Sequence, residues 1–114
     1  IACLNWELPA VHYLVGWSGK KVPLAKYATL GTQELSDEII QAIGGYNACL
    51  MANHGIVTVG KTLVAAFNTA EEVELVARIF IQAKSIGEPI ILSDAEMEVV
   101  AEKFKTYGQV KKIH

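Results

Sequence analysis

His54 is the histidine best placed for chemistry in this 114-residue sequence. It stands where an apolar run gives way to the turn sequence Asn53-His54-Gly55. Imidazole nitrogens are preferred zinc donors, and a catalytic zinc usually takes three protein ligands and keeps one position open for water or substrate. His54 is therefore either one ligand of a larger metal centre or a turn residue bonded to backbone. His12 lies between Val11 and Tyr13 in an apolar run, where we expect a structural role.

The tyrosines are the next candidates, because a phenol can act as a general acid or base when a nearby cation lowers its pKa from about 10. They stand at positions 13, 27, 46 and 107. Tyr107 follows Phe104 near the end of the last predicted helix and precedes Gly108 and a polar tail that can move. The alternative for Tyr107 is a packing role, with its ring against the core and its hydroxyl in water.

A phosphate-loop pattern is also present. Residues 55–62 read Gly-Ile-Val-Thr-Val-Gly-Lys-Thr, which matches the pattern G-x-x-x-x-G-K-[ST]. Such a loop must curl so that its N–H groups converge on an anion, whereas the run from Ile56 to Val59 favours an extended strand. A nucleotide-binding function at this segment remains an alternative from a different class.

The elements that must position these residues are read from hydrophobic periodicity and from turn and capping residues. The predicted order is strand, short strand, helix, two strands, long helix and last helix. The predicted strands are 8–15, 22–25, 47–52 and 56–60, and the predicted helices are 31–44, 62–87 and 93–108. This is an α/β chain. Thr62 and Ser93 are the expected N-caps of the last two helices.

Two strands carry information about their surroundings. Pro23 has no N–H to give to a ladder, which predicts that strand 22–25 lies at a sheet edge. Strand 56–60 is apolar on both faces, which is typical of a strand covered on both sides. A sheet of so few strands rarely buries a hydrophobic core by itself. We therefore expect polypeptide outside this sequence to cover part of the sheet.

Composition excludes several classes of function. Hydrophobic residues make up 52% of the chain and mean hydropathy is +0.30, which predicts one folded domain and not a disordered segment. A net charge of −2 gives no cationic surface for nucleic acid or an anionic membrane. Cys3 and Cys49 form no disulfide or zinc-knuckle pattern, so a reducing, cytoplasmic setting is expected. No apolar run approaches the roughly 20 residues of a membrane span.

Four motifs together resemble the class II aldolase/adducin family, most closely its fuculose-phosphate branch. The motifs are Pro9-Ala10-Val11-His12-Tyr13, the segment 23–32 (PLAKYATLGT), Asn53-His54-Gly55 and the segment 102–108 (EKFKTYG). The resemblance runs over essentially the whole chain. It implies a layered α/β fold with a central, mostly antiparallel sheet flanked by helices.

The resemblance also implies an activity and an assembly. Members cleave L-fuculose 1-phosphate or a related sugar phosphate to dihydroxyacetone phosphate and L-lactaldehyde, with one zinc ion per site and no other cofactor. The implied partner is a small phosphorylated sugar, and the implied assembly is a homotetramer whose sites lie between subunits. Same-fold epimerases, dehydratases and a non-catalytic interaction module remain alternatives.

Site residues follow from the motif positions. His54 matches the family's third zinc-ligand histidine. Tyr13 matches a tyrosine that transfers a proton at the aldehyde-side oxygen in a neighbouring subunit's site. Tyr107 matches a tyrosine of the C-terminal region that closes over the substrate, and Phe104 and Leu30 match apolar wall positions.

The sequence departs from the family pattern at its start. The family's paired zinc histidines, its catalytic glutamate and its phosphate-binding loops precede the position that matches Ile1. We therefore expect residues 1–114 to be the C-terminal portion of a single class II aldolase domain. By itself, this sequence is expected neither to bind zinc tightly nor to cleave substrate.

Overall fold

The computed structural model describes residues 1–113, and their side chains as far as Thr106. Its elements, in chain order, are η1 (Ala2–Leu4), η2 (Tyr13–Trp17), β1 (Leu24–Ala25), α1 (Gln33–Ile43), β2 (Ala48–Met51), β3 (Gly55–Thr58), α2 (Leu63–Ile86) and α3 (Asp94–Ile113). η1 and η2 are 3-10 helices. The predicted α/β class is confirmed.

The sheet has the order β1-β2-β3 and is mixed. β2 and β3 form an antiparallel hairpin in which Leu50 faces Ile56, as the two predicted strands around the turn at His54 require. β1 pairs with β2 in parallel, with Leu24 opposite Leu50. β1 is an edge strand, which confirms the prediction from Pro23, whose carbonyl accepts a hydrogen bond from the N–H of Leu50 at 2.8 Å.

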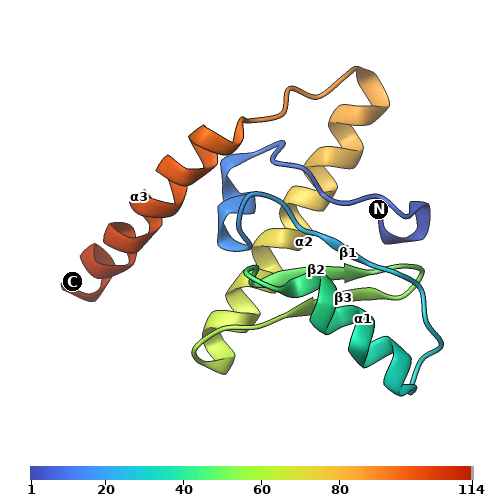
Figure 1. Cartoon of the computed structure of the whole chain (residues 1–114). Helices are drawn as coiled ribbons and strands as arrows, with labels where there is room; N and C mark the ends of the chain where they lie inside the picture. The colour runs from blue at the N-terminus through green and yellow to red at the C-terminus, as the bar shows by residue number, and fades with distance from the viewer. Residues whose placement is uncertain (114) are drawn as a thin grey trace.

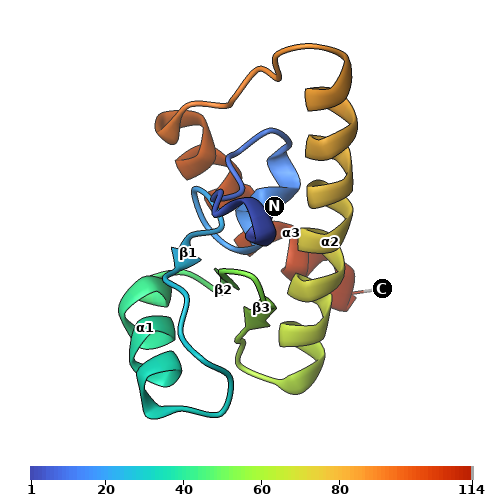
Figure 2. The same cartoon turned by 90° about the vertical axis from the view of Figure 1, so that its right-hand side faces the viewer.

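The sheet lies between α1 and α2 (Figure 2). β2 is buried along its whole length, because its alternating side chains enter two separate cores. Ala48 and Leu50 pack in the larger core with Val73, Val76 and Phe80 of α2. Met51 packs on the other side with Leu35 of α1 and Ala28. Strand β3 was predicted to be covered on both faces, but its residues are only half-buried.

Capping explains where the helices begin. Thr32 Oγ1 accepts the N–H of Leu35 at the start of α1, and Thr62 Oγ1 accepts the N–H of Ala65 at 3.0 Å at the start of α2. Ser93 Oγ accepts the N–H of Glu96 before α3. These bonds satisfy N–H groups that a helix leaves without partners in its first turn, so the predicted caps are confirmed. α3 continues to Ile113, past its predicted end at Gly108.

The predicted strand 8–15 is wrong. Leu8 makes only an isolated antiparallel bridge with Val22, and η2 begins at Tyr13. Pro9 cannot donate to a ladder, and His12 Nδ1 accepts the N–H of Leu14 at 3.2 Å, which caps the 3-10 turn. The structural role expected for His12 is confirmed. Leu8 and Val15 are fully buried in the larger core, so tertiary packing holds the irregular segment in place.

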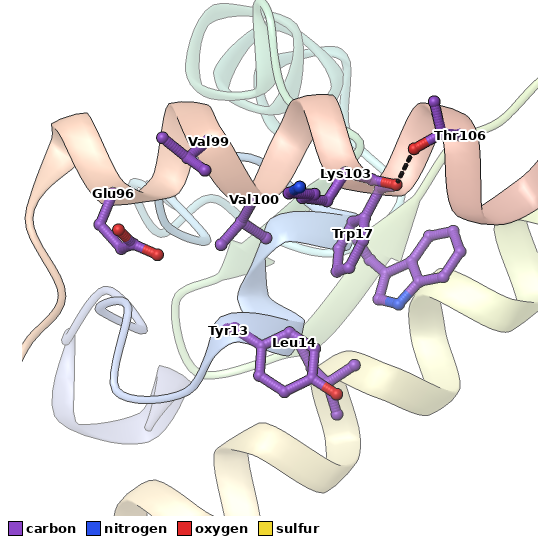
Figure 3. Close-up of a pocket in the computed structure, with 9 residues that line it drawn as sticks. Tyr13, Leu14, Trp17, Glu96, Val99, Val100, Lys103 and Thr106 are labelled. Carbon is purple, nitrogen blue, oxygen red and sulfur yellow. Dashed lines mark hydrogen bonds between the residues drawn. The ribbon is translucent and has the colours of Figure 1, made fainter.

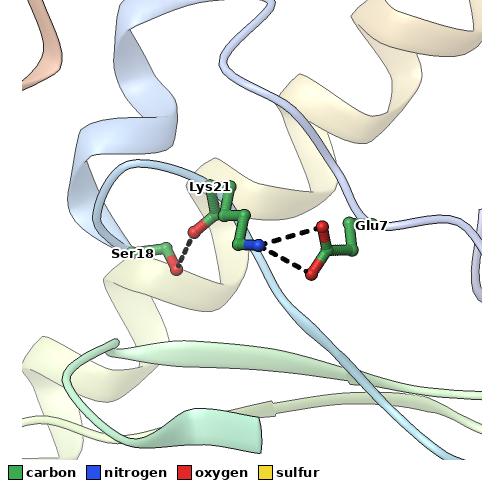
Figure 4. A network of polar contacts seen from close by, with 3 residues as sticks. All are labelled: Glu7, Ser18 and Lys21. Atoms are coloured by element: carbon green, nitrogen blue, oxygen red, sulfur yellow. Dashed lines mark hydrogen bonds and ion pairs between the residues drawn. The ribbon is translucent and has the colours of Figure 1, made fainter. Parts of the chain in front are cut away.

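The turn after η2 is fixed by polar contacts (Figure 4). Lys21 Nζ lies 2.9 Å from Glu7 Oε2, and Ser18 Oγ donates to the carbonyl of Lys21 at 2.9 Å. The hydrogen bond to the Glu7 carboxylate raises the pKa of Lys21, although partial burial opposes the shift. The lysine therefore stays charged, and the contact joins the N-terminal segment to the turn that follows η2.

α3 packs against η2 and then runs at an angle away from the rest of the molecule (Figure 1). Its approach is guided by the N–H of Leu92, which donates to the carbonyl of Ala10 at 2.9 Å. Met97 and Val100 are buried in the larger core. Within the described residues, no helix is long and apolar enough to cross a membrane.

Candidate functional site

His54 lies in the turn between β2 and β3, as predicted from the sequence. The turn is shaped by main-chain groups: the N–H of His54 donates to the carbonyl of Met51 at 3.0 Å, and the N–H of Asn53 donates to the carbonyl of Ala2. Asn53 has φ 58°, a left-handed conformation that asparagine tolerates. The His54 side chain is exposed and lines a cavity of about 310 Å³.

The donor set near His54 fits a zinc ion only in part. Cys3 and Glu74 line the same cavity as His54. Among the described side chains, however, no group of three histidine, cysteine or acidic residues is placed to hold a metal. An exposed imidazole at a cavity suits a ligand of zinc, which takes three protein donors in catalytic centres. The described part of this chain therefore does not supply a complete set of three donors by itself.

A larger cavity, of about 620 Å³, lies between η2 and α3 (Figure 3). Tyr13, Leu14 and Trp17 line it from η2, and the α3 residues that line it include Val99, Val100 and Phe104. Its walls are mainly apolar, with polar groups contributed by Glu96, Lys103 and Thr106. The cavity of Tyr13 and the cavity of His54 share no residue.

Three aromatic rings meet at this cavity. The Trp17 and Phe104 rings are stacked, with centroids 4.9 Å apart and planes at 25°. Tyr13 is tilted against Phe104 at 6.2 Å and stacks on His12 at 4.8 Å. The Tyr13 side chain is half-exposed, with 51% of its surface open. The structure therefore brings together two of the predicted site residues, Tyr13 and Phe104.

The other predicted residues lie elsewhere. Leu30 is 74% exposed, just before Gly31 in the loop that leads to α1, and it lines neither of these two cavities. The side chain of Tyr107 lies outside the described residues. Residues 55–62, which match the phosphate-loop pattern, do not begin with a loop. Residues 55–58 form strand β3 and pair with β2. The backbone there is extended, so it lacks the curl that a phosphate nest requires.

Gly16 and Trp17 were missed from the sequence because the segment was read as the end of a strand and the start of a turn. A Cβ atom on Gly16 would lie 2.8 Å from Val100 Cγ1 and 2.8 Å from Phe104 Cε2. Gly16 thus lets α3 approach η2 closely enough for Phe104 to reach Trp17. The sequence Gly16-Trp17 could have indicated a close contact at this point. It does not show that the contact is made by α3.

Gly16→Ala is expected to destabilise the docking of α3. Val100 is buried and has little room to move, so overpacking should lower the free energy of unfolding by about 1–3 kcal/mol. Gly44→Ala is the matched control, because a Cβ there meets no atom within 4 Å. Denaturant titration of both variants measures the difference. Equal stability of the two variants would contradict the close approach at Gly16.

The buried cysteine, Cys49, does not offer an activated thiol in the structure. Both cysteines of the chain are free, with Cys3 exposed and Cys49 buried in β2. Burial raises the pKa of the Cys49 thiol, and a hydrogen bond involving the Ala25 backbone opposes the shift only in part. The thiolate is the nucleophilic form, so Cys49 is disfavoured as a nucleophile at neutral pH.

Comparison with known proteins gives one consistent result. The family model described as "Class II Aldolase and Adducin N-terminal domain" matches residues 1–81. The chain is 47% identical over 109 residues to 5-deoxy-D-ribulose 1-phosphate aldolase of Bacillus thuringiensis serovar kurstaki, covering 96% of this chain and 51% of that protein. It is also 47% identical over 109 residues to 5-methylthioribulose-1-phosphate/5-deoxyribulose-1-phosphate aldolase of Rhodospirillum rubrum, covering 95% and 49%.

A solved structure has the same fold. An L-fuculose 1-phosphate aldolase superposes with a TM-score of 0.90 at 51% sequence identity, covering 91% of this chain and 49% of that one. The chain thus spans about half the length of the relatives that it matches.

Proposed function

Because this chain belongs to the class II aldolase and adducin family, we propose that it forms part of a zinc-dependent sugar-phosphate aldolase. The observation that carries the proposal is the exposed imidazole of His54 at the β2–β3 turn, beside a cavity, in a chain with this family match. In the proposal, residues 1–114 are the C-terminal portion of a single domain. The remaining zinc ligands come from polypeptide outside this sequence.

His54 is the proposed zinc ligand of this chain. Bound zinc would act as a Lewis acid, polarising the substrate oxygens and stabilising the charge that develops as the carbon–carbon bond breaks. The hairpin suits this role because β2 is buried and its main-chain bonds fix the turn. These bonds fix the backbone position from which the imidazole projects.

Tyr13 is the proposed proton-transfer residue. Its phenol borders the larger cavity, and its ring contacts His12 and Phe104. A hydroxyl at a cavity can give a proton to the aldehyde-side oxygen, or accept one from it, once that oxygen lies within hydrogen-bond reach. Phe104 and Leu30 are proposed as apolar walls that limit water around the substrate, and Tyr107 as a residue that closes over it.

The proposed sites lie between subunits of a homotetramer. His54 and Tyr13 line cavities with no residue in common, so one copy of the described chain does not join them. A second copy that places its Tyr13 beside the first copy's His54 would complete a site. Exposed apolar side chains such as Leu63, Phe67 and Ile86 provide surface that further polypeptide or another copy can cover.

The proposed substrates are L-fuculose 1-phosphate or a related sugar phosphate, cleaved to dihydroxyacetone phosphate and an aldehyde. L-fuculose 1-phosphate would give L-lactaldehyde. The names of the relatives add 5-deoxyribulose 1-phosphate and 5-methylthioribulose 1-phosphate as candidates. We place the enzyme in the cytoplasm, in keeping with its two free cysteines.

Release of dihydroxyacetone phosphate from these three sugar phosphates tests the proposal. We expect the native protein to release it from at least one of them, to lose the activity on chelation and to recover it with added zinc. Lys61→Ala serves as the control, because the aldolase proposal gives Lys61 no part, whereas nucleotide binding at residues 55–62 would depend on it. An epimerase or dehydratase would convert the sugar phosphate without this product, and that result would contradict the proposal.

A further inference from the structure

Trp17 and Phe104 are in contact at the larger cavity. The two rings are stacked at 4.9 Å, and both border the cavity. Gly16 leaves no side chain between η2 and α3, so the Phe104 ring lies directly against the η2 backbone. Stacking on Trp17 is therefore one of the contacts that orient the Phe104 ring, together with its contact with Tyr13.

Trp17 is itself fixed by the main chain. Its carbonyl accepts a hydrogen bond from Asn47 Nδ2 at 3.1 Å, and the N–H of Asn47 donates to the carbonyl of Ser18 at 2.9 Å. Asn47 directly precedes β2, so these bonds connect the end of η2 to the buried central strand. The indole thus stands on a part of the molecule that has little freedom to move.

We propose that Trp17 is a specificity-determining residue of the aldolase, an inference that rests on the proposed function. It positions Phe104 and, with Tyr13 and Phe104, forms an aromatic wall for the apolar end of the sugar, remote from the phosphate. This wall selects a sugar phosphate that ends in a thioether over one that ends in a methyl group.

Two properties of the cavity support this choice. Its volume of about 620 Å³ leaves ample room beyond a methyl group, so a longer apolar end can be buried there. A thioether sulfur also makes favourable contacts with aromatic rings at about 5 Å, whereas a methyl group gains only its apolar burial. Each added apolar group in such a pocket is worth about tenfold or more in kcat/KM.

The test compares 5-methylthioribulose 1-phosphate with 5-deoxyribulose 1-phosphate as substrates of the native protein and of two variants. Trp17→Phe keeps an aromatic ring against Phe104, whereas Trp17→Leu keeps apolar bulk without a ring. We expect the native protein to favour the thioether substrate by about tenfold in kcat/KM. Trp17→Phe should keep this ratio within about threefold, and Trp17→Leu should lower it by about threefold to tenfold.

The effect should appear mainly in KM, because the contact is made to a terminal group that takes no part in bond breaking and acts on substrate and transition state alike. A thermal melt of each variant separates this effect from a loss of folding, which lowers both rates together. If Trp17→Leu still cleaves both substrates and the ratio of their kcat/KM values is unchanged, the proposed role of Trp17 is wrong, while the proposed aldolase activity stands. If the native protein releases dihydroxyacetone phosphate from neither these substrates nor L-fuculose 1-phosphate, the proposed aldolase is wrong and the inference falls with it.

Discussion

His54→Ala is expected to remove zinc from the native protein and to lower aldol cleavage by more than about 100-fold. A bound metal contributes several kcal/mol of transition-state stabilisation, and each 1.36 kcal/mol is a factor of about ten in rate. The side chain is exposed and the turn is held by main-chain bonds, so the variant should fold normally. Zinc content and the release of dihydroxyacetone phosphate measure the two effects.

His12→Asn is the matched control for the loss of an imidazole. It also removes one histidine, but asparagine can still accept the N–H of Leu14 at the start of η2. We expect its zinc content to equal that of the native protein. Full zinc occupancy and normal cleavage in His54→Ala would contradict the assignment of His54 as a ligand.

Tyr13→Phe is expected to lower kcat by about 100-fold to 10,000-fold, which is the usual contribution of a general acid or base. The substitution removes only the hydroxyl and keeps the ring that packs between His12 and Phe104. Zinc content and thermal stability should therefore stay at native values. Steady-state kinetics of cleavage measure the loss, with zinc analysis of the same sample.

Tyr27→Phe provides the comparison, because Tyr27 is similarly exposed, at 59%, and borders neither the His54 cavity nor the Tyr13 cavity. It should cleave substrate at close to the native rate. If Tyr13→Phe and Tyr27→Phe showed the same rate, the hydroxyl of Tyr13 would have no part in proton transfer.

Sequence patterns predicted the elements that are built from local signals. α2 was predicted with both its N-cap, Thr62, and the glycine at its end, Gly87, because capping and periodicity are encoded within a few residues. The two strands around His54 were predicted for a similar reason, since an apolar run precedes the turn and a β-branched run follows it. These elements place His54, so its position at a turn was predictable.

The segment around Tyr13 was not predictable from local signals. Residues 8–15 have the composition of a strand, but Pro9 interrupts the ladder and the His12 side chain caps a 3-10 turn. Burial of Leu8 and Val15 against distant parts of the chain decides the outcome. Tertiary packing overrides strand propensity here, and no pattern within the segment reveals it.

The contact between Tyr13 and Phe104 was also not predictable from the sequence. The motif resemblance gave each residue a role, but their contact requires α3 to dock on η2 through Gly16. The stacking partner Trp17 became visible only in three dimensions.

Anomalous diffraction at the zinc edge, from crystals of the native protein, tests the central claim most directly. We predict one strong peak at about 2.0–2.1 Å from an imidazole nitrogen of His54, the normal zinc–nitrogen distance. The side chain of Tyr13 from another copy should border the same site. A zinc peak bound elsewhere, with the His54 ring free of metal, would contradict the account.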